Sequence, residues 1–380
     1  MTLSAFRAPG RVRIGDFYPH LGSIGANSWA GGIVVSMQRG HMTQESPSSP
    51  NNETPPAAPR GGVLHGLIKL MRLHQWSKGI FVLIGPFFAL ADGKLQSMPR
   101  PELALAIACT FVGFGLAASG CYIFNDLADV ERDRAHPRKR KRPLASGQVP
   151  LGIAKVFGVV ILLISLASVL GVPSELRIWV MGLLVLYIIN VNLYSGGLKH
   201  IVIVDVLCLS SGFVIRVLGG CAAVGVTPST WLLNATLFLS MFLAFGKRLG
   251  ERRHLGGDEA AMAARDVQQH YSDQMLRMFV VVTGVATLLT YTSYVQSRHD
   301  DFVYTFATRQ GSLSESFGFN LMWVTVAPAT LALLRTITLL MRGRYDDPTE
   351  LALRDNMVRL AGLIFVASTV IVLWIHQNQL

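Results

Sequence analysis

Apolar residues in this chain gather in long blocks, and short polar segments separate one block from the next. Most blocks hold about 18 to 22 residues, enough for a helix to span the hydrocarbon core of a bilayer. The stretch from Leu64 to Lys78, before the first and shortest block, is amphipathic and is expected to lie in the membrane interface. We predict an all-α integral membrane protein with nine transmembrane helices. Their expected ranges are 79–92, 103–124, 151–171, 176–193, 201–222, 230–246, 275–296, 318–341 and 358–376.

Residues 1–60 differ in kind from the rest of the chain. The segment 44–60 consists largely of Ser, Pro, Asn and Glu and offers almost nothing to bury, which is typical of disorder. No charged start followed by an apolar run is present, so we expect no secretory signal. Met37 and Met42 precede the polar linker and leave open a start site placed too far upstream. We expect a disordered segment at 1–60, without an assigned function, and a nine-helix membrane domain at 61–380.

Composition supports the membrane prediction, because only 15% of the 380 residues are charged and 51% are hydrophobic. Soluble domains carry roughly a quarter charged residues, enough to cover a water-facing surface. The segments after the second, fourth, sixth and eighth predicted helices hold 16 Lys and Arg residues, and the alternate segments hold five. Basic loops face the cytoplasm, so we expect a cytoplasmic N-terminus. The net charge of +11 therefore indicates a membrane surface or an anionic substrate rather than a nucleic acid.

The strongest chemical signal follows the second predicted helix. Asn125 and Asp126 begin it, and Asp129 and Asp133 lie three and seven residues after Asp126. If the helix continues, this spacing places all three carboxylates on one face. Converging carboxylates repel one another unless a cation joins them, and Mg²⁺ typically takes one or two carboxylates together with substrate phosphate oxygens. The motif predicts such a site, and the alternative is a solvated helix end.

A basic loop comes immediately after the acidic motif. It contains five consecutive cations, from Arg138 to Arg142. Such a run is typical of a cytoplasmic loop that contacts lipid headgroups, and it also suits a phosphorylated substrate held next to it. We expect Lys139 and Arg142 to serve the substrate and the other cations mostly to set the topology.

Two further clusters follow the fourth and sixth predicted helices. The fourth helix ends near Tyr194 and Lys199, and the fifth contains Asp205 and Arg216. Ionisable groups inside an apolar run are costly, so the last two are expected to face the bundle interior or a cavity, and mutual pairing is the structural alternative. Lys199 could instead snorkel to the interface.

The sixth helix ends in Gly246-Lys247-Arg248-Leu249-Gly250-Glu251. Lys247 and Glu251 have the spacing of an ordinary surface ion pair, which is one interpretation of this cluster. Near the first helix, Arg72 and Lys78 add two more cations. Trp76 beside them is expected to be a membrane-interface anchor.

These motifs together resemble a known family. The strings N-D-x-x-D-x-x-x-D at 125–133, R-P-L-A-S-G at 142–147 and Y-x-x-x-x-K at 194–199 are similar to those of the UbiA superfamily of intramembrane prenyltransferases, over about residues 64–376. Fuller strings resemble one branch, the decaprenyl-phosphate phosphoribosyltransferases. They are H-Q-W-S-K at 74–78, D-R-A-H-P-x-K-R-x-R-P at 133–143, Y-S-x-x-L-K-H-x-x-x-x-D at 194–205 and G-K-R-x-x-E at 246–251.

The resemblance implies a UbiA-like bundle in a bacterial plasma membrane, with its active site on the cytoplasmic side. It implies transfer of 5-phosphoribose from phosphoribosyl diphosphate to a polyprenyl phosphate, with Mg²⁺ as the cofactor and Mn²⁺ as its substitute. The implied catalytic residues are Asp126, Asp129, Asp133 and Lys199, of which the three acids are also the metal ligands. The implied substrate-binding residues are Lys78, Asn125, Lys139, Arg142, Tyr194, Lys247, Arg248 and Glu251.

One departure from the wider superfamily bears on the donor. Ordinary members carry a second acidic motif, D-x-x-x-D, after the sixth helix, where this chain has the cationic string from Lys247 to Glu251. A donor with an additional phosphate suits that replacement. Gly79 departs from the branch itself, which is expected to have Asn there.

Two other functions are compatible with the sequence. The first is a UbiA-type prenyltransferase that moves an isoprenoid from its diphosphate to an aromatic or other acceptor. The second is a transporter or a non-catalytic membrane scaffold, since carriers also combine apolar helices with intramembrane charges. Three acids beside a Lys/Arg run favour diphosphate chemistry, and no internal repeat is visible. The sequence carries no signal for an oligomeric state.

Overall fold

The computed structural model describes residues 62–91, 93–95, 98–137, 139–254, 271–298, 302–307, 316–344, 350–351 and 354–377. Contacts divide the chain into two units, 1–57 and 58–380, and all described residues belong to the second. The predicted disordered segment at 1–60 lies outside the described residues.

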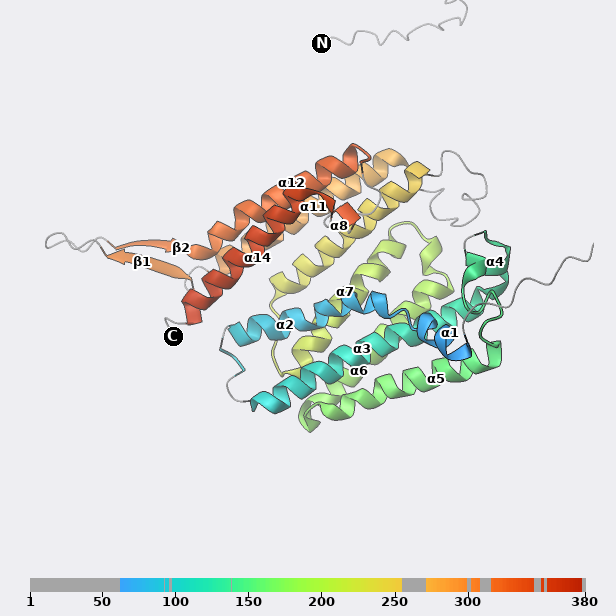
Figure 1. Cartoon of the computed structure of the whole chain (residues 1–380). Coiled ribbons are helices and arrows are strands. Elements are labelled where there is room, and N and C mark those ends of the chain that lie inside the picture. Colours follow the sequence, from blue (N-terminus) through green and yellow to red (C-terminus); the bar gives the residue numbers. More distant parts are fainter. Residues whose placement is uncertain are drawn as a thin grey trace, which may run out of the picture. The chain divides into compact units, whose positions relative to one another are not determined.

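The described residues contain eight helical segments long and apolar enough to cross a membrane, which confirms a multi-pass, nearly all-helical fold (Figure 1). These segments are α3 Arg100–Ala128, α5 Leu151–Ala167 with η3 Ser168–Gly171, α6 Ser174–Gly196, α7 Val204–Ala223, α8 Thr230–His254, α11 Asp273–Ser297, η5 Leu321–Thr325 with α12 Val326–Met341, and α14 Asn356–Gln377. The shorter helices are α1 Val63–Leu70, η1 Leu73–Gly79, α2 Ile80–Ala91, α4 Val130–Ala135, η2 Lys139–Lys141 and η4 Leu198–His200.

The first predicted span is the one that departs from the expected nine. It corresponds to α2, which has 12 residues and follows the 3₁₀ helix η1. At 1.5 Å per residue α2 covers about 18 Å, less than the roughly 30 Å of a bilayer core. Among the described residues, eight segments are thus long and apolar enough to span a bilayer, and α2 is too short to do so alone.

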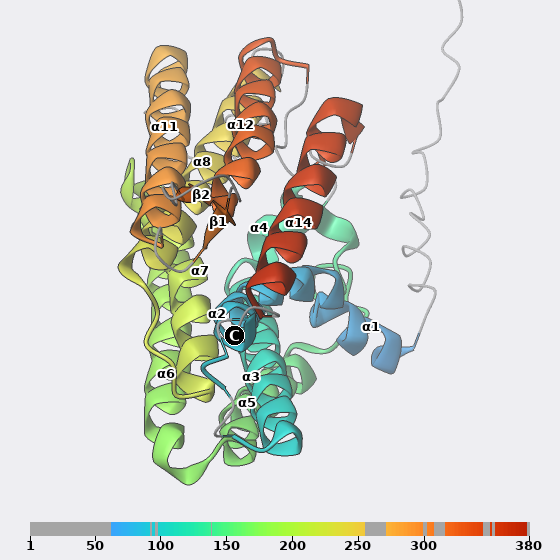
Figure 2. The ribbon, with the colours of Figure 1, turned by 90° about the vertical axis from the view of Figure 1, so that its left-hand side faces the viewer.

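The helices pack in two groups that share α7 and α8 as their common boundary. One group holds α2, α3, α5, α6 and α7, and the other holds α8, α11, α12 and α14 (Figures 1 and 2). Phe114 of α3 and Tyr187 of α6 are buried in the core of the first group. Phe242 of α8 and Leu339 of α12 are buried in the core of the second. Each group thus has a hydrophobic core of its own.

A β-hairpin interrupts the helical pattern between α11 and α12. Strand β1, Val303–Ala307, pairs antiparallel with β2, Ser316–Asn320, and Val303 lies opposite Asn320. The predicted all-α fold class did not include this hairpin, and the helix expected from 318 begins only at Leu321. Alternating Phe and Gly at 317–319 have the period of a strand, and Asn320 then accepts a hydrogen bond from the Met322 amide.

The alternation of helix direction places the polar motifs at one end of the bundle. The C-terminal ends of α3, α6 and α8 lie there, together with the N-terminal end of α7. The hairpin lies at the opposite end (Figure 1). The sequence motifs of three separate segments therefore meet on one side of the domain.

Candidate active site

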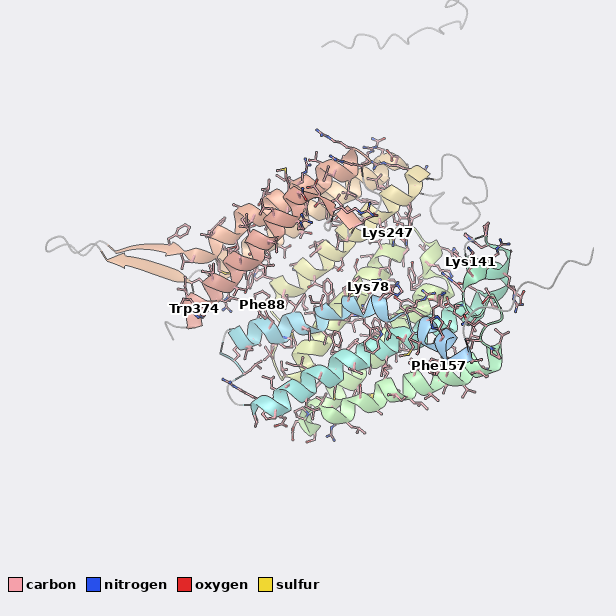
Figure 3. The ribbon with its side chains drawn as sticks, in the orientation of Figure 1. Lys78, Phe88, Lys141, Phe157, Lys247 and Trp374 are labelled. Atoms are coloured by element: carbon pink, nitrogen blue, oxygen red, sulfur yellow. The ribbon has the colours of Figure 1, made fainter. Side chains whose placement is uncertain are left out.

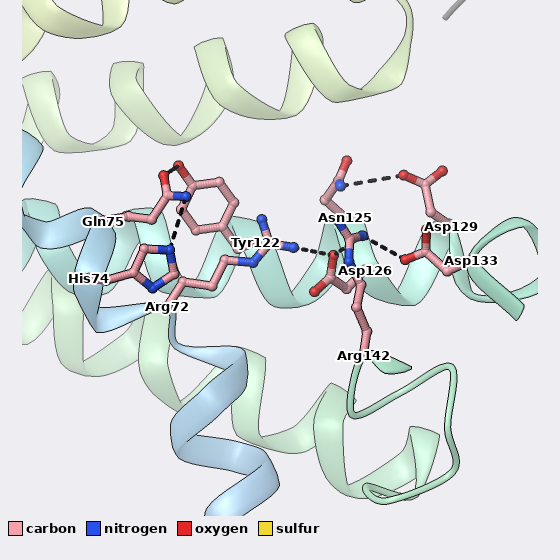
Figure 4. A network of polar contacts seen from close by, with 9 residues as sticks. All are labelled: Arg72, His74, Gln75, Tyr122, Asn125, Asp126, Asp129, Asp133 and Arg142. Atoms are coloured by element: carbon pink, nitrogen blue, oxygen red, sulfur yellow. Dashed lines mark hydrogen bonds and ion pairs between the residues drawn. The ribbon is translucent and has the colours of Figure 1, made fainter. Parts of the chain in front are cut away.

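The acidic motif lies at an interruption between α3 and α4, so the condition of a continuous helix, under which the three carboxylates would share one face, is not met. Asp129 has φ −95° and ψ 7° and stands between Ala128, which ends α3, and Val130, which begins α4. The motif makes two separate sets of contacts (Figure 4). Asn125 donates to Asp129, whereas Asp126 and Asp133 contact arginines. In the described part of the chain, no group of three or more His, Cys, Asp and Glu side chains is arranged to hold a metal ion.

Two arginines neutralise the buried acids of this motif. Arg72 Nη2 lies 2.6 Å from Asp126 Oδ1, and Arg142 Nη1 lies 3.1 Å from the same oxygen. Arg142 Nη1 also lies 2.6 Å from Asp133 Oδ2. Asp126 and Asp133 are only 3% and 2% exposed, and carboxylates at that depth need paired cations. Arg142 therefore links two of the acids, and its expected contact with the substrate stays a prediction.

Arg72 is a site residue that the sequence did not single out for this role. It has a left-handed backbone (φ 51°) at the junction of α1 and η1, which turns its side chain toward α3. Trp76 fixes this junction, because its Nε1 donates to Ser119 Oγ at 3.1 Å. A Cβ atom on Gly115 would lie 2.8 Å from the indole. Trp76 is thus packed on α3, and its expected role as an interface anchor stays a prediction.

Asp126 and Asp129 keep carboxylate oxygens that no described cation contacts, and these are the donor atoms that Mg²⁺ takes. Both arginines donate to Oδ1 of Asp126, and the described residues place no donor on Oδ2. Asp129 has Asn125 as its partner, at 3.4 Å, and no arginine among the described residues. Carboxylate oxygens of this kind, completed by substrate phosphates, are what Mg²⁺ prefers. Asp133 instead forms an ion pair with Arg142.

A second polar cluster surrounds Asp205 at the start of α7. Asp205 is fully buried and accepts hydrogen bonds from Tyr271 Oη at 2.5 Å and Arg248 Nε at 3.0 Å. The alternative that Asp205 pairs with Arg216 is wrong. Burial, and the hydrogen bond to Asp205, raise the pKa of Tyr271, so the phenol stays a donor at neutral pH. Tyr271 Oη also accepts from the Ile203 amide and so ties the start of α11 to that of α7.

Arg248 connects Asp205 to two residues of the sequence motifs, Glu251 and Tyr194. It donates to Glu251 Oε2 at 2.9 Å and to Tyr194 Oη at 3.4 Å. Its side chain is 6% exposed, and two carboxylates compensate its charge. The structure thus brings together three residues that the sequence assigned to substrate binding, Arg248, Glu251 and Tyr194. This geometry suits a positioning role for Arg248 better than direct phosphate binding.

The four lysines predicted to bind substrate differ in burial and in their contacts with other protein groups. Lys139 and Lys199 are half-buried, and neither side chain has a polar partner among the residues described. Lys78 is exposed and donates to Gln75 Oε1 at 2.9 Å, and Lys247 is exposed at the end of α8. Figure 3 shows Lys78, Lys141 and Lys247 toward the end of the bundle that carries α4. The four lysines come from four segments, and each is at least partly exposed.

An apolar cavity of about 650 Å³ lies between the two helix groups. Its walls come from α2, α8, α11, α12 and α14, and they include Phe88, Leu239, Tyr291 and Phe365. Phe88 is labelled in Figure 3, toward the end away from α4. A space of this size and polarity suits part of a lipid chain.

The Asp205 cluster yields a stability prediction. Asp205→Asn is expected to lower the free energy of unfolding by about 1–3 kcal/mol, because the buried Arg248 loses one of its two carboxylates. Thermal unfolding in detergent measures this loss. Glu350→Gln is the control, since Glu350 forms an exposed pair with Arg354 and should contribute less than about 1 kcal/mol. Equal shifts for the two variants would show that the cluster is not a stabilising core.

Comparison with known proteins agrees with this geometry. Residues 79–358 match the model of the UbiA prenyltransferase family. The chain belongs to this family. It is 32% identical over 339 residues to a protein of Mycolicibacterium smegmatis named decaprenyl-phosphate phosphoribosyltransferase, across 87% of this chain and 98% of the relative. A protein of the same name from Mycobacterium tuberculosis is 31% identical over 312 residues, across 82% and 95% of the two chains.

Solved structures support the same fold. A UbiA homologue from Archaeoglobus fulgidus, bound to GPP and Mg²⁺, has a TM-score of 0.52 and 16% identity, and the match covers 82% of this chain and 98% of that chain. The UbiA-like bundle expected from the motifs is therefore confirmed. The family match begins at Gly79 and leaves out Arg72, although Arg72 contacts the acidic motif of this UbiA-family protein.

Proposed function

We propose that this protein transfers 5-phosphoribose from phosphoribosyl diphosphate to a polyprenyl phosphate in the membrane and releases diphosphate. The observation that carries this proposal is the excess of cations around only two metal-competent acids, Asp126 and Asp129. Arg72 and Arg142 contact Asp126, Lys139 belongs to the same basic loop as Arg142, and Lys199 follows α6, whose C-terminal end lies on the same side of the bundle. Donor and acceptor together bring a diphosphate and two phosphates, and such a site can neutralise them. Relatives at about 30% identity over most of the chain have the corresponding name.

The acidic motif has the role of holding the cofactor and the leaving group. Asp126 and Asp129, with the amide oxygen of Asn125, are the residues that would hold Mg²⁺. When bound, the metal neutralises the charge that develops on the diphosphate. Asp133 keeps Arg142 in place, and the exposed third of Arg142 remains accessible to a phosphate. Mn²⁺ is expected to substitute, because it takes the same oxygen ligands.

The cations divide into binding and positioning residues. Lys78, Lys139, Lys199 and Lys247 are proposed to contact substrate phosphates. Arg248 and Glu251, which pair with each other, are proposed to hold Tyr194 and the end of α8 in position.

The transfer needs no general base from the protein. The bond between C1 of the ribose and the diphosphate oxygen breaks, and its electron pair leaves with the diphosphate. The ribosyl centre develops oxocarbenium character, as in glycosyl transfer. An oxygen of the acceptor phosphate, already anionic at neutral pH, forms the new bond to C1. The residues around the site therefore bind, orient and compensate charge.

The apolar cavity bears on where the lipid chain binds, and the loop charges bear on which side of the membrane the site faces. The cavity between α2, α8, α11, α12 and α14 is proposed to take part of the polyprenyl chain. The basic segments at the site end are proposed to face the cytoplasm, which puts the reaction on the cytoplasmic side of a bacterial plasma membrane.

A second candidate function is prenyl transfer from an isoprenoid diphosphate. The likeness in fold to a UbiA homologue bound to GPP and Mg²⁺ favours it, and the apolar cavity suits either lipid.

One assay separates the two functions and tests the metal. Purified protein with Mg²⁺, labelled phosphoribosyl diphosphate and a polyprenyl phosphate should move label into the lipid phase. EDTA should abolish this transfer, and Mg²⁺ or Mn²⁺ should restore it. Consumption of an isoprenyl diphosphate, without phosphoribosyl transfer, would instead establish the prenyltransferase.

A further inference from the structure

Arg216 is a buried intramembrane cation without a counter-charge in the described part of the chain. It lies within α7 and is 7% exposed. Its Nη2 donates to Tyr187 Oη at 2.6 Å, and its Nη1 donates to the Gly212 carbonyl at 3.1 Å. Both partners are neutral, and among the described residues no carboxylate pairs with Arg216.

This lone charge contrasts with the other buried charges of the site end. Asp126, Asp133, Asp205 and Arg248 each have a partner of opposite charge. The guanidinium of Arg216 lies 4.4 Å from the centre of the Tyr187 ring and 5.4 Å from that of Phe213, as in other desolvated cation–π contacts. These rings offset only part of the cost of a charge within a membrane span. An unbalanced charge at this depth indicates a ligand rather than a structural pair.

Tyr122 lies on α3 between the acidic motif and the helix that carries Arg216. It is one helical turn before Asp126, and α3 packs against α7. Arg72 lies 4.8 Å above its ring and also contacts Asp126. The hydroxyl of Tyr122 donates to Gln75 Oε1 at 3.1 Å. Polar and cationic groups thus run from the acids to Tyr122 on α3 (Figure 4), and Arg216 lies on α7, which packs against that helix.

We propose that Arg216 is the innermost anion-binding residue of the site and receives a phosphate group of a substrate beside Tyr122. The phosphate supplies the counter-charge that the protein lacks. A guanidinium suits this contact because it can hold a phosphate with two parallel hydrogen bonds. Tyr187 orients the guanidinium before the substrate arrives. The inference rests on the proposed function, which brings the phosphate of either the donor or the acceptor to this end of the bundle.

The test compares Arg216→Met with Arg216→Lys and with the control Arg335→Met. Arg335 is also an arginine of a membrane helix, but Asp355 compensates its charge at 3.0 Å. For each protein, thermal unfolding and the dissociation constant are measured with phosphoribosyl diphosphate and Mg²⁺ in one arm and with a polyprenyl phosphate in the other. The two arms identify which substrate carries the phosphate.

Arg216→Met is expected to leave the unfolding temperature without ligand unchanged or higher, because a lone buried charge is removed. Its affinity for one of the two substrates should fall about tenfold, and Arg216→Lys should recover part of that loss. Arg335→Met should unfold at a lower temperature and bind both substrates normally. Unchanged affinities for both substrates in Arg216→Met, with a lower unfolding temperature without ligand, would overturn the inference and make Arg216 structural.

The same measurements on the unsubstituted protein keep the two proposals apart. If it binds geranyl diphosphate and not phosphoribosyl diphosphate, the proposed function fails. The affinity of Arg216→Met for geranyl diphosphate then decides the role of Arg216: a tenfold loss supports it, and no loss overturns it.

Discussion

Asp129→Asn is expected to lower the transfer rate by about 10²- to 10³-fold, the usual cost of one electrostatic contact to a transition state. The substitution removes a charge without changing volume. It is a cleaner test than Asp126→Asn, because Asp129 contacts only Asn125 among the described residues. Asp126 also holds Arg72 and Arg142, so its substitution disturbs both arginines. Initial rates measured against Mg²⁺ concentration should show that Asp129→Asn needs more metal.

A nearby acid provides the matched control for this experiment. Glu131 lies two residues away, its side chain is 79% exposed, and it pairs only with Arg134 in the described structure. Glu131→Gln should therefore keep the rate and the metal dependence of the unsubstituted protein. Asp126→Asn should lose transfer as well, through the metal and the arginines together. If Asp129→Asn keeps more than half of the original turnover, the assignment of Asp129 to the metal is wrong.

The membrane helices could be predicted from the sequence because the bilayer itself imposes their length and polarity. The segment expected at 151–171 is observed as Leu151–Gly171, and the one expected at 275–296 as Asp273–Ser297. The motifs also predicted the family, which the match over 79–358 confirms. Both predictions depend on which residues follow one another along the chain, and this can be read from the sequence alone.

Contacts between helices were harder to predict, because hydropathy does not fix how each helix is rotated against its neighbours. Asp205 and Arg216 share one helix, and yet Asp205 pairs with Arg248 of α8 while Arg216 faces Tyr187 of α6. The sequence likewise gave no signal that Trp76 packs on α3. These partners are set by tertiary packing alone.

The break at Asp129 had no sequence signal either. Neither glycine nor proline stands between Asn125 and Asp133, and the spacing of the acids fits an unbroken helix. In the structure, Asp126 pairs with Arg72 and Asp133 pairs with Arg142. The identity of the acidic motif was therefore predictable, but the division of its acids between metal and arginines was not.

Lys247→Ala is expected to weaken binding of phosphoribosyl diphosphate roughly 10- to 100-fold and to affect binding of polyprenyl phosphate much less. The cost corresponds to about 1.5–3 kcal/mol for a charge-assisted contact to a phosphate. Of the two adjacent cations in the last turns of α8, Arg248 is buried between Asp205 and Glu251, whereas Lys247 is exposed. Lys247 is thus the cation of this motif that a donor phosphate can reach. Dissociation constants for both substrates, each at two salt concentrations, measure the difference.

Lys155→Ala and Glu251→Ala complete this experiment. Lys155 is an exposed lysine near the start of α5, so its removal controls for the loss of one positive charge from the protein. It should leave donor binding unchanged. If Lys247 instead lies at a solvated helix surface without contacting the donor, Lys247→Ala should weaken donor binding no more than Lys155→Ala does, by at most about 0.3–0.5 kcal/mol. Glu251→Ala also removes a carboxylate from the buried Arg248, so it should lower the stability of the protein rather than its affinity for the donor. Equal small effects of Lys247→Ala and Lys155→Ala on donor binding would remove Lys247 from the donor site and favour the prenyltransferase, because the cationic end of α8 would then no longer indicate a donor with an extra phosphate.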